Sequence, residues 1–454
     1  MNSIALSPGG VVVTDTSKVR LIPQQLRLRW LITSLLSLAL AATGFLAYRA
    51  YAHVVQTIGR DSVPSIVAAQ HIRGTLADAH TELINAFLNR ESADGPSMQS
   101  YRKKLAETND HLLDAAQNIT YGDEERKPIL AMMVALGEYE TRVGSALSTQ
   151  DNSDALYQAD QIMRRSILPA ARALDMANFE HMNTAYKDEL AAAHLRLTIF
   201  GIVALCLAAG LLEAQLSLFR HFRRVLNLPM VVGSVICVAA ATLVAIQATQ
   251  VGQQIRAATE DAFDSIHALT QARAEAYSAN AAESLFLVST DPKIRTQQAD
   301  LFQKSAAALM AQDMQSAPAI PANLKLLKGK GLLGDELANI TFDGEEQHAR
   351  NTWRAWAQYV LIDQRIRALE SSGQHAQAVR LCLGEDTGQS DWQFKQFLDE
   401  LDRTLKINQE AFERFIAQAE AYCQRLWRLL LICVLAPLVG AGLGFQQRLK
   451  EFRE

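Results

Sequence analysis

Two long apolar runs separated by a short basic connector lie in the middle of the chain. Residues 195–219 and 225–249 carry few charges, and residues 220–224 between them read Arg-His-Phe-Arg-Arg. The hydrocarbon core of a membrane needs about 20 apolar residues as helix, and each run supplies that many. So short a connector permits only an antiparallel pair, and short basic loops stay in the cytoplasm. The runs therefore predict a membrane hairpin whose two outer ends lead to the extracytoplasmic side.

Two further apolar runs, residues 30–48 and 425–446, predict a first and a fourth span. Basic residues precede the first run, which places the N-terminus in the cytoplasm. The alternative is a cleaved signal peptide, because residues 50–52 read Ala-Tyr-Ala. An apolar core near 20 residues is too long for a signal sequence, whose core has about 7–15. We therefore expect a multi-pass protein of the bacterial cytoplasmic (inner) membrane with both termini in the cytoplasm.

The two segments between the outer and inner spans read as long helices. In residues 49–194, apolar side chains recur every three or four positions, and turn-forming residues predict helices at 54–91, 97–120, 123–147 and 153–194. The predicted fold class is an all-α membrane protein with four transmembrane helices and two tandem extracytoplasmic antiparallel four-helix bundles. The expected divisions are a cytoplasmic tail (1–29), span 1 (30–48), bundle 1 (49–194), span 2 (195–219), a cytoplasmic connector (220–224), span 3 (225–249), bundle 2 (250–424), span 4 (425–446) and a cytoplasmic tail (447–454).

The two halves share short matches in the same order, which indicates a tandem duplication. Residues 118–125 read NITYGDEE and residues 339–346 read NITFDGEE. Such a block is typical of a corner between two helices, where glycine takes a left-handed turn and acids suit the positive first turn of the next helix. A docking edge at this corner is the functional alternative, and Asn118-Ile119-Thr120 also fits a glycosylation sequon. The second half carries an insertion, residues 317–334, which we expect to be a loop.

The candidate ligand or partner surface consists of basic and aromatic residues. Arg73 and Arg273 occupy equivalent places in the two halves, where a cation between the bundles can pair with a ligand carboxylate. The alternative is an arginine that is solvated or paired inside its own bundle. A second cluster can line a pocket or belong to the bundle core; it comprises Arg350, Trp353, Arg354 and Trp356.

Polar residues near the cytoplasmic end of span 2 form a second set of candidates. Glu213, with Gln215 nearby, is an acid well inside a predicted span, and intramembrane carboxylates are costly and often functional. We expect a polar lock between spans, or a pairing of Glu213 with the connector. The connector itself offers a cytoplasmic contact surface made of Arg220, Arg223 and Arg224.

Several classes of function are disfavoured by the sequence. The formal net charge of −4 lacks the basic footprint of a nucleic-acid-binding protein. We find no metal-binding, phosphate-binding or nucleophile motif, so we expect no enzyme activity, no cofactor and no metal. Outside the apolar runs only Cys382 and Cys423 remain, too few for a disulfide framework, and whether these two pair stays open.

The unit of span, helical bundle and span resembles the sensory modules of bacterial chemoreceptors and histidine kinases, over residues 30–219 and 225–447. It departs from them after the second span, where no kinase or methylation region follows. A closer similarity is to four-span actinobacterial signalling proteins of the GlnX type, carried by Ile66–Gln70, Asn118–Asp123 and Leu168–Ala171. That resemblance implies a relay between a periplasmic solute-binding lipoprotein and a cytoplasmic kinase.

The sequence thus predicts a membrane sensor or relay that passes an extracytoplasmic signal to a cytoplasmic partner through helix shifts, without an output domain of its own. The signal would be a small molecule or a ligand-loaded binding protein. Chemoreceptor-like bundles are commonly dimers, so the resemblance implies a homodimer. A scaffold that senses nothing is the main alternative, and an accessory subunit of a transporter is a second one.

Overall fold

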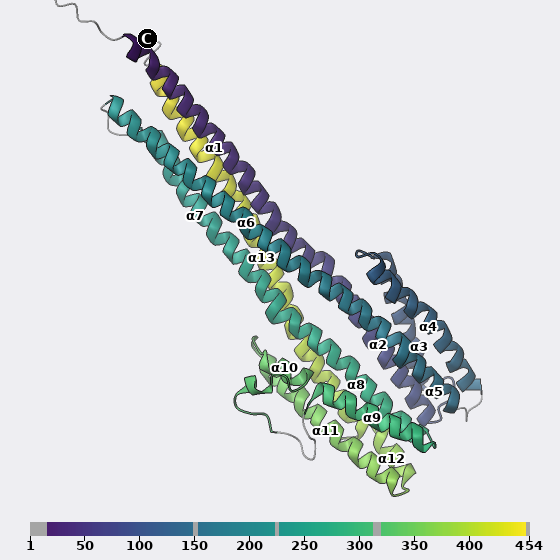
Figure 1. Cartoon of the computed structure of the whole chain (residues 1–454). Helices are drawn as coiled ribbons and strands as arrows, with labels where there is room; N and C mark the ends of the chain where they lie inside the picture. The colour runs from purple at the N-terminus through teal and green to yellow at the C-terminus, as the bar shows by residue number, and fades with distance from the viewer. Residues whose placement is uncertain (1–15, 149–152, 223–226, 312–318, 451–454) are drawn as a thin grey trace, which may run out of the picture. The chain divides into compact units, whose positions relative to one another are not determined.

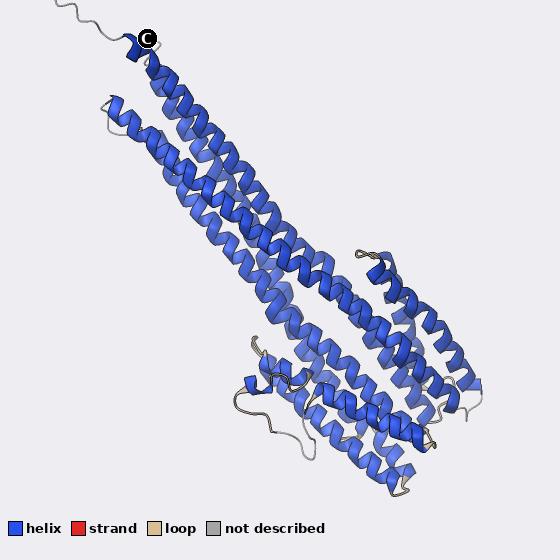
Figure 2. Cartoon of the chain, viewed as in Figure 1, coloured by secondary structure: helices blue, strands red, loops and turns tan. Residues whose placement is uncertain are grey.

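The computed structural model describes residues 16–148, 153–222, 227–311 and 319–450, and these residues form helices and connecting loops without a strand (Figure 2). The chain divides into two compact units. Unit 1 comprises residues 1–53, 189–252 and 420–454, and unit 2 comprises residues 54–188 and 253–419. The predicted all-α class is confirmed for the described residues. Four helices are long and apolar enough to cross a membrane, namely those within Gln24–Gly59, Ser153–Arg220, Leu228–Val288 and Ser390–Gln447.

Unit 1 contains parts of four helices: α1 (Thr16–Gln56), α6 (Leu168–Phe222), α7 (Leu228–Arg256) and α13 (Ser390–Lys450) (Figure 1). Their contacts depend on small residues, as is common where membrane helices pack closely. A Cβ atom on Gly44 of α1 would lie 2.7 Å from Leu430 of α13, and one on Gly233 of α7 would lie 2.7 Å from the carbonyl oxygen of Ala436. Large apolar side chains face outward, which suits a surface exposed to lipid; they include Leu35, Leu38, Leu205, Val235 and Leu435.

The first half of unit 2 consists of a π-helical turn (Thr57–Ser62), α2 (Val63–Leu88), α3 (Pro96–Gln117), α4 (Asp123–Ser148), α5 (Ser153–Ile162), a second π-helical turn (Met163–Ile167) and the beginning of α6. These bounds lie close to the helices expected from the sequence. The apolar stripe of α2 is buried at Ile72, Leu76 and Leu83, and it packs with side chains of α4 and α5 such as Tyr139 and Leu156.

The second half of unit 2 contains more helices than the four expected. It consists of a π-helical turn (Ala257–Phe263), α8 (Asp264–Val288), α9 (Pro292–Leu309), a 3-10 turn (Leu324–Leu327), α10 (Leu332–Ala338), α11 (Glu345–Ser371), α12 (His375–Cys382) and the beginning of α13. The loop expected at 317–334 is confirmed for most of its described part, because residues 319–331 contain only the one 3-10 turn; α10 begins at Leu332, inside the expected loop, and Leu327 and Leu333 are buried. Cys382 and Cys423 are free thiols.

Helix α8 links the two halves of unit 2. It packs along α2, and its Ala281 and Leu285 belong to the same apolar core as the residues of α2 to α6. Figure 1 shows α2 and α8 side by side in unit 2. Because the two halves share one core, a displacement of helices at the α2–α8 contact affects the packing of both halves.

One glutamate holds each of the repeated corners. The Oε2 atom of Glu125 accepts hydrogen bonds from the backbone N–H groups of Thr120 and Tyr121, both at 2.6 Å. In the second half, Glu345 Oε2 accepts from the N–H groups of Thr341 at 2.8 Å and Phe342 at 3.0 Å. The repeated block therefore acts as a helix corner, as the sequence suggested. In each half one glutamate of the next helix accepts hydrogen bonds from loop N–H groups that have no partner within a helix.

Replacing Glu345 with alanine is expected to lower the free energy of unfolding by about 1–3 kcal/mol, because two backbone donors of a partly buried loop lose the fully buried carboxyl group that accepts from them. Glu345 also accepts from the amide of Asn408. Thermal unfolding of the whole chain in mild detergent measures the loss. Glu346→Ala is the matched control, since that neighbouring side chain is 53% exposed and should change stability by less than about 0.5 kcal/mol. Equal losses in both variants would contradict this account of the corner.

Candidate functional site

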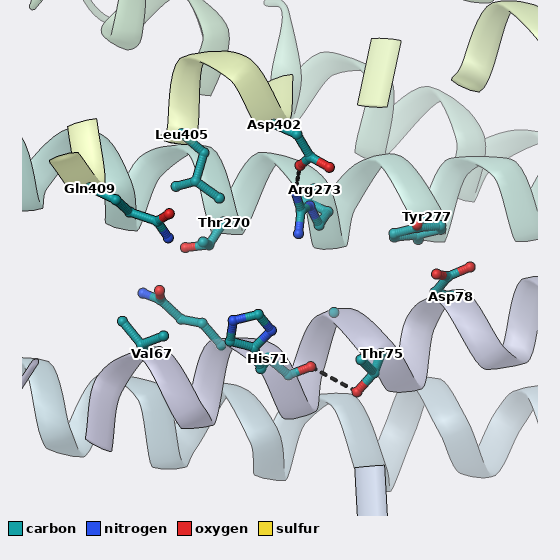
Figure 3. A pocket seen from close by; sticks show the side chains of 12 residues that line it. Val67, His71, Thr75, Asp78, Thr270, Arg273, Tyr277, Asp402, Leu405 and Gln409 are labelled. Carbon is teal, nitrogen blue, oxygen red and sulfur yellow. Dashed lines mark hydrogen bonds and ion pairs between the residues drawn. The ribbon is translucent and has the colours of Figure 1, made fainter. Parts of the chain in front are cut away.

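A cavity of about 300 Å³ lies within unit 2 between α2, α8 and α13 (Figure 3). Its size is at the lower end of the range for small-molecule sites, which is about 300–1,000 Å³. Both halves of the chain supply its walls. The lining residues are Val67, Gln70, His71, Gly74, Thr75 and Asp78 of α2, Thr270, Arg273 and Tyr277 of α8, and Asp402, Leu405 and Gln409 of α13.

Arg273 is the cation of this cavity. Its side chain extends from α8 toward the gap between the helices, and it forms an ion pair with Asp402 of α13 (Figure 3). The Arg273 side chain is 23% exposed, whereas that of Asp402 is 56% exposed. Burial lowers the pKa of Arg273 from its ordinary value, but a guanidinium stays protonated in proteins. The cavity therefore presents a fixed positive charge whose partner is solvent-accessible.

The α2 wall of the cavity carries neutral and acidic hydrogen-bonding groups. His71 stacks on His111 of α3 with ring centroids 5.6 Å apart. Burial lowers the pKa of His71, and the charges of His111 and Arg273 lower it further, so this imidazole is a neutral group at pH 7. At the other end, Asp78 lies 2.5 Å from Lys104, and burial raises its pKa.

The chemistry of the cavity follows from this arrangement. The middle of the cavity offers a guanidinium with five N–H donors, suited to a planar anionic group such as a carboxylate. Asp78 lies toward one end beside Tyr277, and Thr270 and Gln409 add hydroxyl and amide groups toward the other end (Figure 3). A polar molecule held here touches both halves of the chain at once.

Arg73, the sequence equivalent of Arg273, lies elsewhere. Its residue is 8% exposed, and its guanidinium faces Glu275 of α8 at 3.5 Å. The structure therefore brings only one of the two repeated arginines to the cavity. Arg73 is a paired arginine, which was the alternative expected from the sequence. Its partner, however, belongs to the other half of the chain rather than to its own bundle.

The structure places the two tryptophans of the α11 cluster in the core, which is the second of the two alternatives left open for this cluster and corrects their assignment to a surface. Trp353 and Trp356 are both 0% exposed, and Trp356 packs on Phe397 of α13 with ring centroids 5.0 Å apart. Arg350 pairs with Glu346 one turn earlier, and Arg354 donates to Asn351. The cause is helical periodicity, since residues one position apart point about 100° away from each other, so the indoles enter the core while Arg354 stays outside.

Glu213 pairs with Arg29 of α1, at 3.0 Å between Nη2 and Oε1, and Arg29 also donates to Ser217. The described contact is thus between α6 and α1 rather than with the connector. Gln215 donates to Ser234 of α7 at 3.2 Å. Both polar residues of α6 therefore bond to a neighbouring helix of unit 1, which is the geometry that a polar lock requires. Arg220 is exposed at the end of α6, and Arg223 and Arg224 lie outside the described residues.

Most of the cavity was not predicted from the sequence. Gln70, His71, Asp78, Tyr277 and Asp402 had no signal that distinguished them from other polar residues on amphipathic helices. The repeated arginine gave the one usable clue, because a charge kept at the same place in both halves pointed to the α8 wall.

Residues 54–187 match a protein family described as the actinobacterial sensor domain. The matched range almost coincides with residues 54–188, the first segment of unit 2. Searches of curated proteins and of solved structures found no match. The first half of unit 2 is thus similar to an actinobacterial sensor domain, in a chain with four helices long and apolar enough to cross a membrane.

Proposed function

We propose that this chain is an integral membrane sensor that reads an extracytoplasmic signal at the cavity between α2, α8 and α13 and passes it to a cytoplasmic partner through helix shifts. The observation that carries the proposal is that the walls of the cavity come from three helices of different parts of the chain. A bound molecule touches α2 and α8, which belong to different halves, and also α13, a single helix from Ser390 to Lys450. That helix contains an apolar stretch long enough to span a membrane.

The proposed topology has four spans, cytoplasmic termini and two tandem extracytoplasmic bundles. Two structural repeats support the duplication. The π-helical turns at Thr57–Ser62 and Ala257–Phe263 begin 200 residues apart, at the offset that aligns Arg73 with Arg273. The corner glutamates, Glu125 and Glu345, hold equivalent loops.

The proposed signal is a small molecule with an anionic group, free or delivered by a binding protein. Such a group competes with Asp402 for the guanidinium of Arg273, and Asp402 is exposed enough to turn into solvent. Loss of this ion pair removes one of the contacts between α13 and α8, which also pack through Phe394 and Tyr277 with ring centroids 5.4 Å apart. Shifts of about 1–2 Å along packed helices are a known means of transmission.

The proposed partners are a periplasmic solute-binding lipoprotein and a cytoplasmic kinase. The proposed oligomeric state of the chain is a homodimer. The cytoplasmic contact surface comprises the connector around Arg220 and the tail 447–454. Affinity purification of the whole chain in mild detergent identifies these partners, and recovery of a transport complex instead would favour the transporter alternative.

A native pair of thiols tests the relay. Cys237 of α7 and Cys433 of α13 lie with their sulfur atoms 3.9 Å apart, so the rate at which an added oxidant joins them reports the alignment of these helices. Asp402→Asn removes the ion pair without a ligand, and we expect it to change this rate at least twofold in membranes. Asp399→Asn, an exposed acid one turn away on α13, is the control and should leave the rate unchanged.

Cys433→Ser establishes that the product is this disulfide. Equal rates in the wild type, Asp402→Asn and Arg273→Gln would contradict the relay, because breaking the ion pair would then leave the helices of unit 1 in place. The scaffold alternative predicts that equality.

A further inference from the structure

A buried polar cluster joins the two halves behind the α2 wall of the cavity. Gln70 of α2 donates from Nε2 to Asp175 Oδ1 of α6 at 3.3 Å, and the same nitrogen lies 3.0 Å from Nδ1 of His267 of α8. Asp175 is 1% exposed and Gln70 is 7% exposed. Because Gln70 also lines the cavity, one side chain connects the buried acid to the proposed input site.

The hydrogen bonds of Gln70 indicate the protonation states of Asp175 and His267. The two hydrogens of Gln70 Nε2 meet a carboxylate oxygen and an imidazole nitrogen, so the nitrogen must be an acceptor and His267 must be neutral. The other nitrogen of His267 then carries the ring hydrogen. It lies 2.6 Å from Nε2 of Gln271, so in this state the Gln271 amide must turn to accept through its oxygen, and Phe179 stacks on the ring with centroids 4.5 Å apart. The arrangement therefore holds Asp175 ionised beside a neutral histidine.

Two oxygens of the cluster have no hydrogen-bond partner among the described residues, Asp175 Oδ2 and Gln70 Oε1. A buried oxygen without a donor is costly. A proton on the carboxyl group would supply the missing donor, and the Gln70 amide would offer the missing acceptor once it rotates. Protonation thus exchanges the two hydrogen bonds of Gln70 Nε2, to Asp175 and His267, for one from the Asp175 carboxyl group to Gln70 Oε1, and it turns the amide that lines the cavity.

The charged groups around the cluster set the pH at which this occurs. Burial raises the pKa of Asp175 to about 6, against the opposing charges of Arg73 of α2 and Arg172 of α6 and the hydrogen bond from Gln70. Burial, together with the charges of the same two arginines, lowers the pKa of His267 to about 4. The remaining charge nearby is Glu275 of α8, which faces Arg73. The pair therefore changes from a net charge of −1 to zero near pH 6.

We propose that Asp175 is a proton-binding group that couples extracytoplasmic pH to the cavity through Gln70, so that the proton regulates the input site. This inference rests on the proposed function only in taking the cavity as that site. Its test needs neither a ligand nor a cytoplasmic partner, so failure of the relay leaves the test intact.

Global stability is a poor readout for this proposal because the two groups act in opposite directions. The raised pKa of Asp175 means that the folded state binds its proton more tightly, so stability increases as the pH falls from 6 toward 4. The lowered pKa of His267 makes stability decrease over the range from 6.5 to 4. A local probe at the cavity is required.

The experiment uses the whole chain in detergent and places a trifluoroethyl label on the cysteine of a Thr270→Cys variant. Thr270 lines the cavity one turn from His267. Cys206→Ser removes the exposed native cysteine, which would otherwise also be labelled. The ¹⁹F resonance is followed from pH 7.5 to pH 5. We expect a single transition with a midpoint near pH 6. Asp175→Asn imitates the protonated acid, so its resonance at pH 7.5 should lie where that of the wild type lies at pH 5, without a transition.

Two other acids provide matched controls, because burial and like charges raise the pKa of Asp264 to about 6 and that of Asp391 to about 7. The transition should persist in Asp264→Asn and in Asp391→Asn. Should Asp175→Asn fail to fold, Gln70→Leu is used, in which Asp175 remains but its connection to the cavity is lost and the transition should disappear. Persistence of the transition in Asp175→Asn or Gln70→Leu, its loss in Asp264→Asn, or its absence from the wild type overturns the proposal.

Discussion

Replacing Arg273 with glutamine is expected to abolish the binding of small carboxylates to the cavity, with a loss of at least tenfold in affinity. Hydrogen bonds to a charged partner contribute about 1.5–3 kcal/mol, and each 1.4 kcal/mol is about a factor of ten in Kd. Arg273 is the one cationic side chain among the lining residues described. Calorimetric titration of the whole chain with acetate, butyrate and succinate measures the effect, and the corresponding amides serve as uncharged probes.

The partner of Arg273 gives this prediction its direction. Asp402 occupies the guanidinium that a carboxylate needs, so Asp402→Asn should tighten carboxylate binding by about tenfold, about 1.4 kcal/mol, while Arg273→Gln removes it. Arg350→Gln is the control, because that arginine is paired on α11 away from the cavity. Amides that bind as well as carboxylates, or an Asp402→Asn variant that binds more weakly than the wild type, would show that the guanidinium does not select the ligand.

Trp356→Ala is expected to lower the free energy of unfolding by about 3–5 kcal/mol, the usual cost of removing a large aromatic side chain from a core. Trp356 is fully buried, and it packs on Tyr359 and Phe397 with ring centroids 5.1 Å and 5.0 Å away. Its indole N–H has no hydrogen-bond partner among the described residues, so the loss reports packing alone. Thermal unfolding in detergent measures it.

Arg354 lies two residues earlier on the same helix and provides the comparison. It is exposed, so Arg354→Ala should change stability by less than about 0.5 kcal/mol. If Trp356 and Arg354 formed one functional surface, both substitutions would instead reduce the binding of a ligand or partner protein and leave the free energy of unfolding nearly unchanged. That outcome would restore the aromatic cluster as a site.

The sequence was most informative where the physical signal is local. Apolar runs of about 20 residues predict long helices because a membrane core has a fixed thickness, and four such helices are present. The helix bounds around Pro96, Gly122 and Ser148 followed from turn chemistry in the same way. The short helix that begins at Leu332, at the end of the insertion, was not predicted, because Leu333 and Leu337 become buried only against the rest of the bundle.

The candidate site was predicted only in part. Arg273 was identified because an arginine occupies the same place in the sequence pattern of each half, yet the same reasoning also selected Arg73, which is paired with Glu275. No periodicity separates the two arginines. The cavity depends on which helix lies opposite, and α13 offers Asp402 to one of them at a separation of more than a hundred residues in sequence.

The sequence by itself determined the helical class and the apolar lengths that can cross a membrane, because these are properties of composition and spacing along a single helix. Only the tertiary structure decided that Trp353 and Trp356 enter the core, that α2 and α8 share one core, and that Gln70 meets both Asp175 and the cavity. These facts depend on how three helices face each other, and a helix of amphipathic sequence records which face is buried but not which partner buries it.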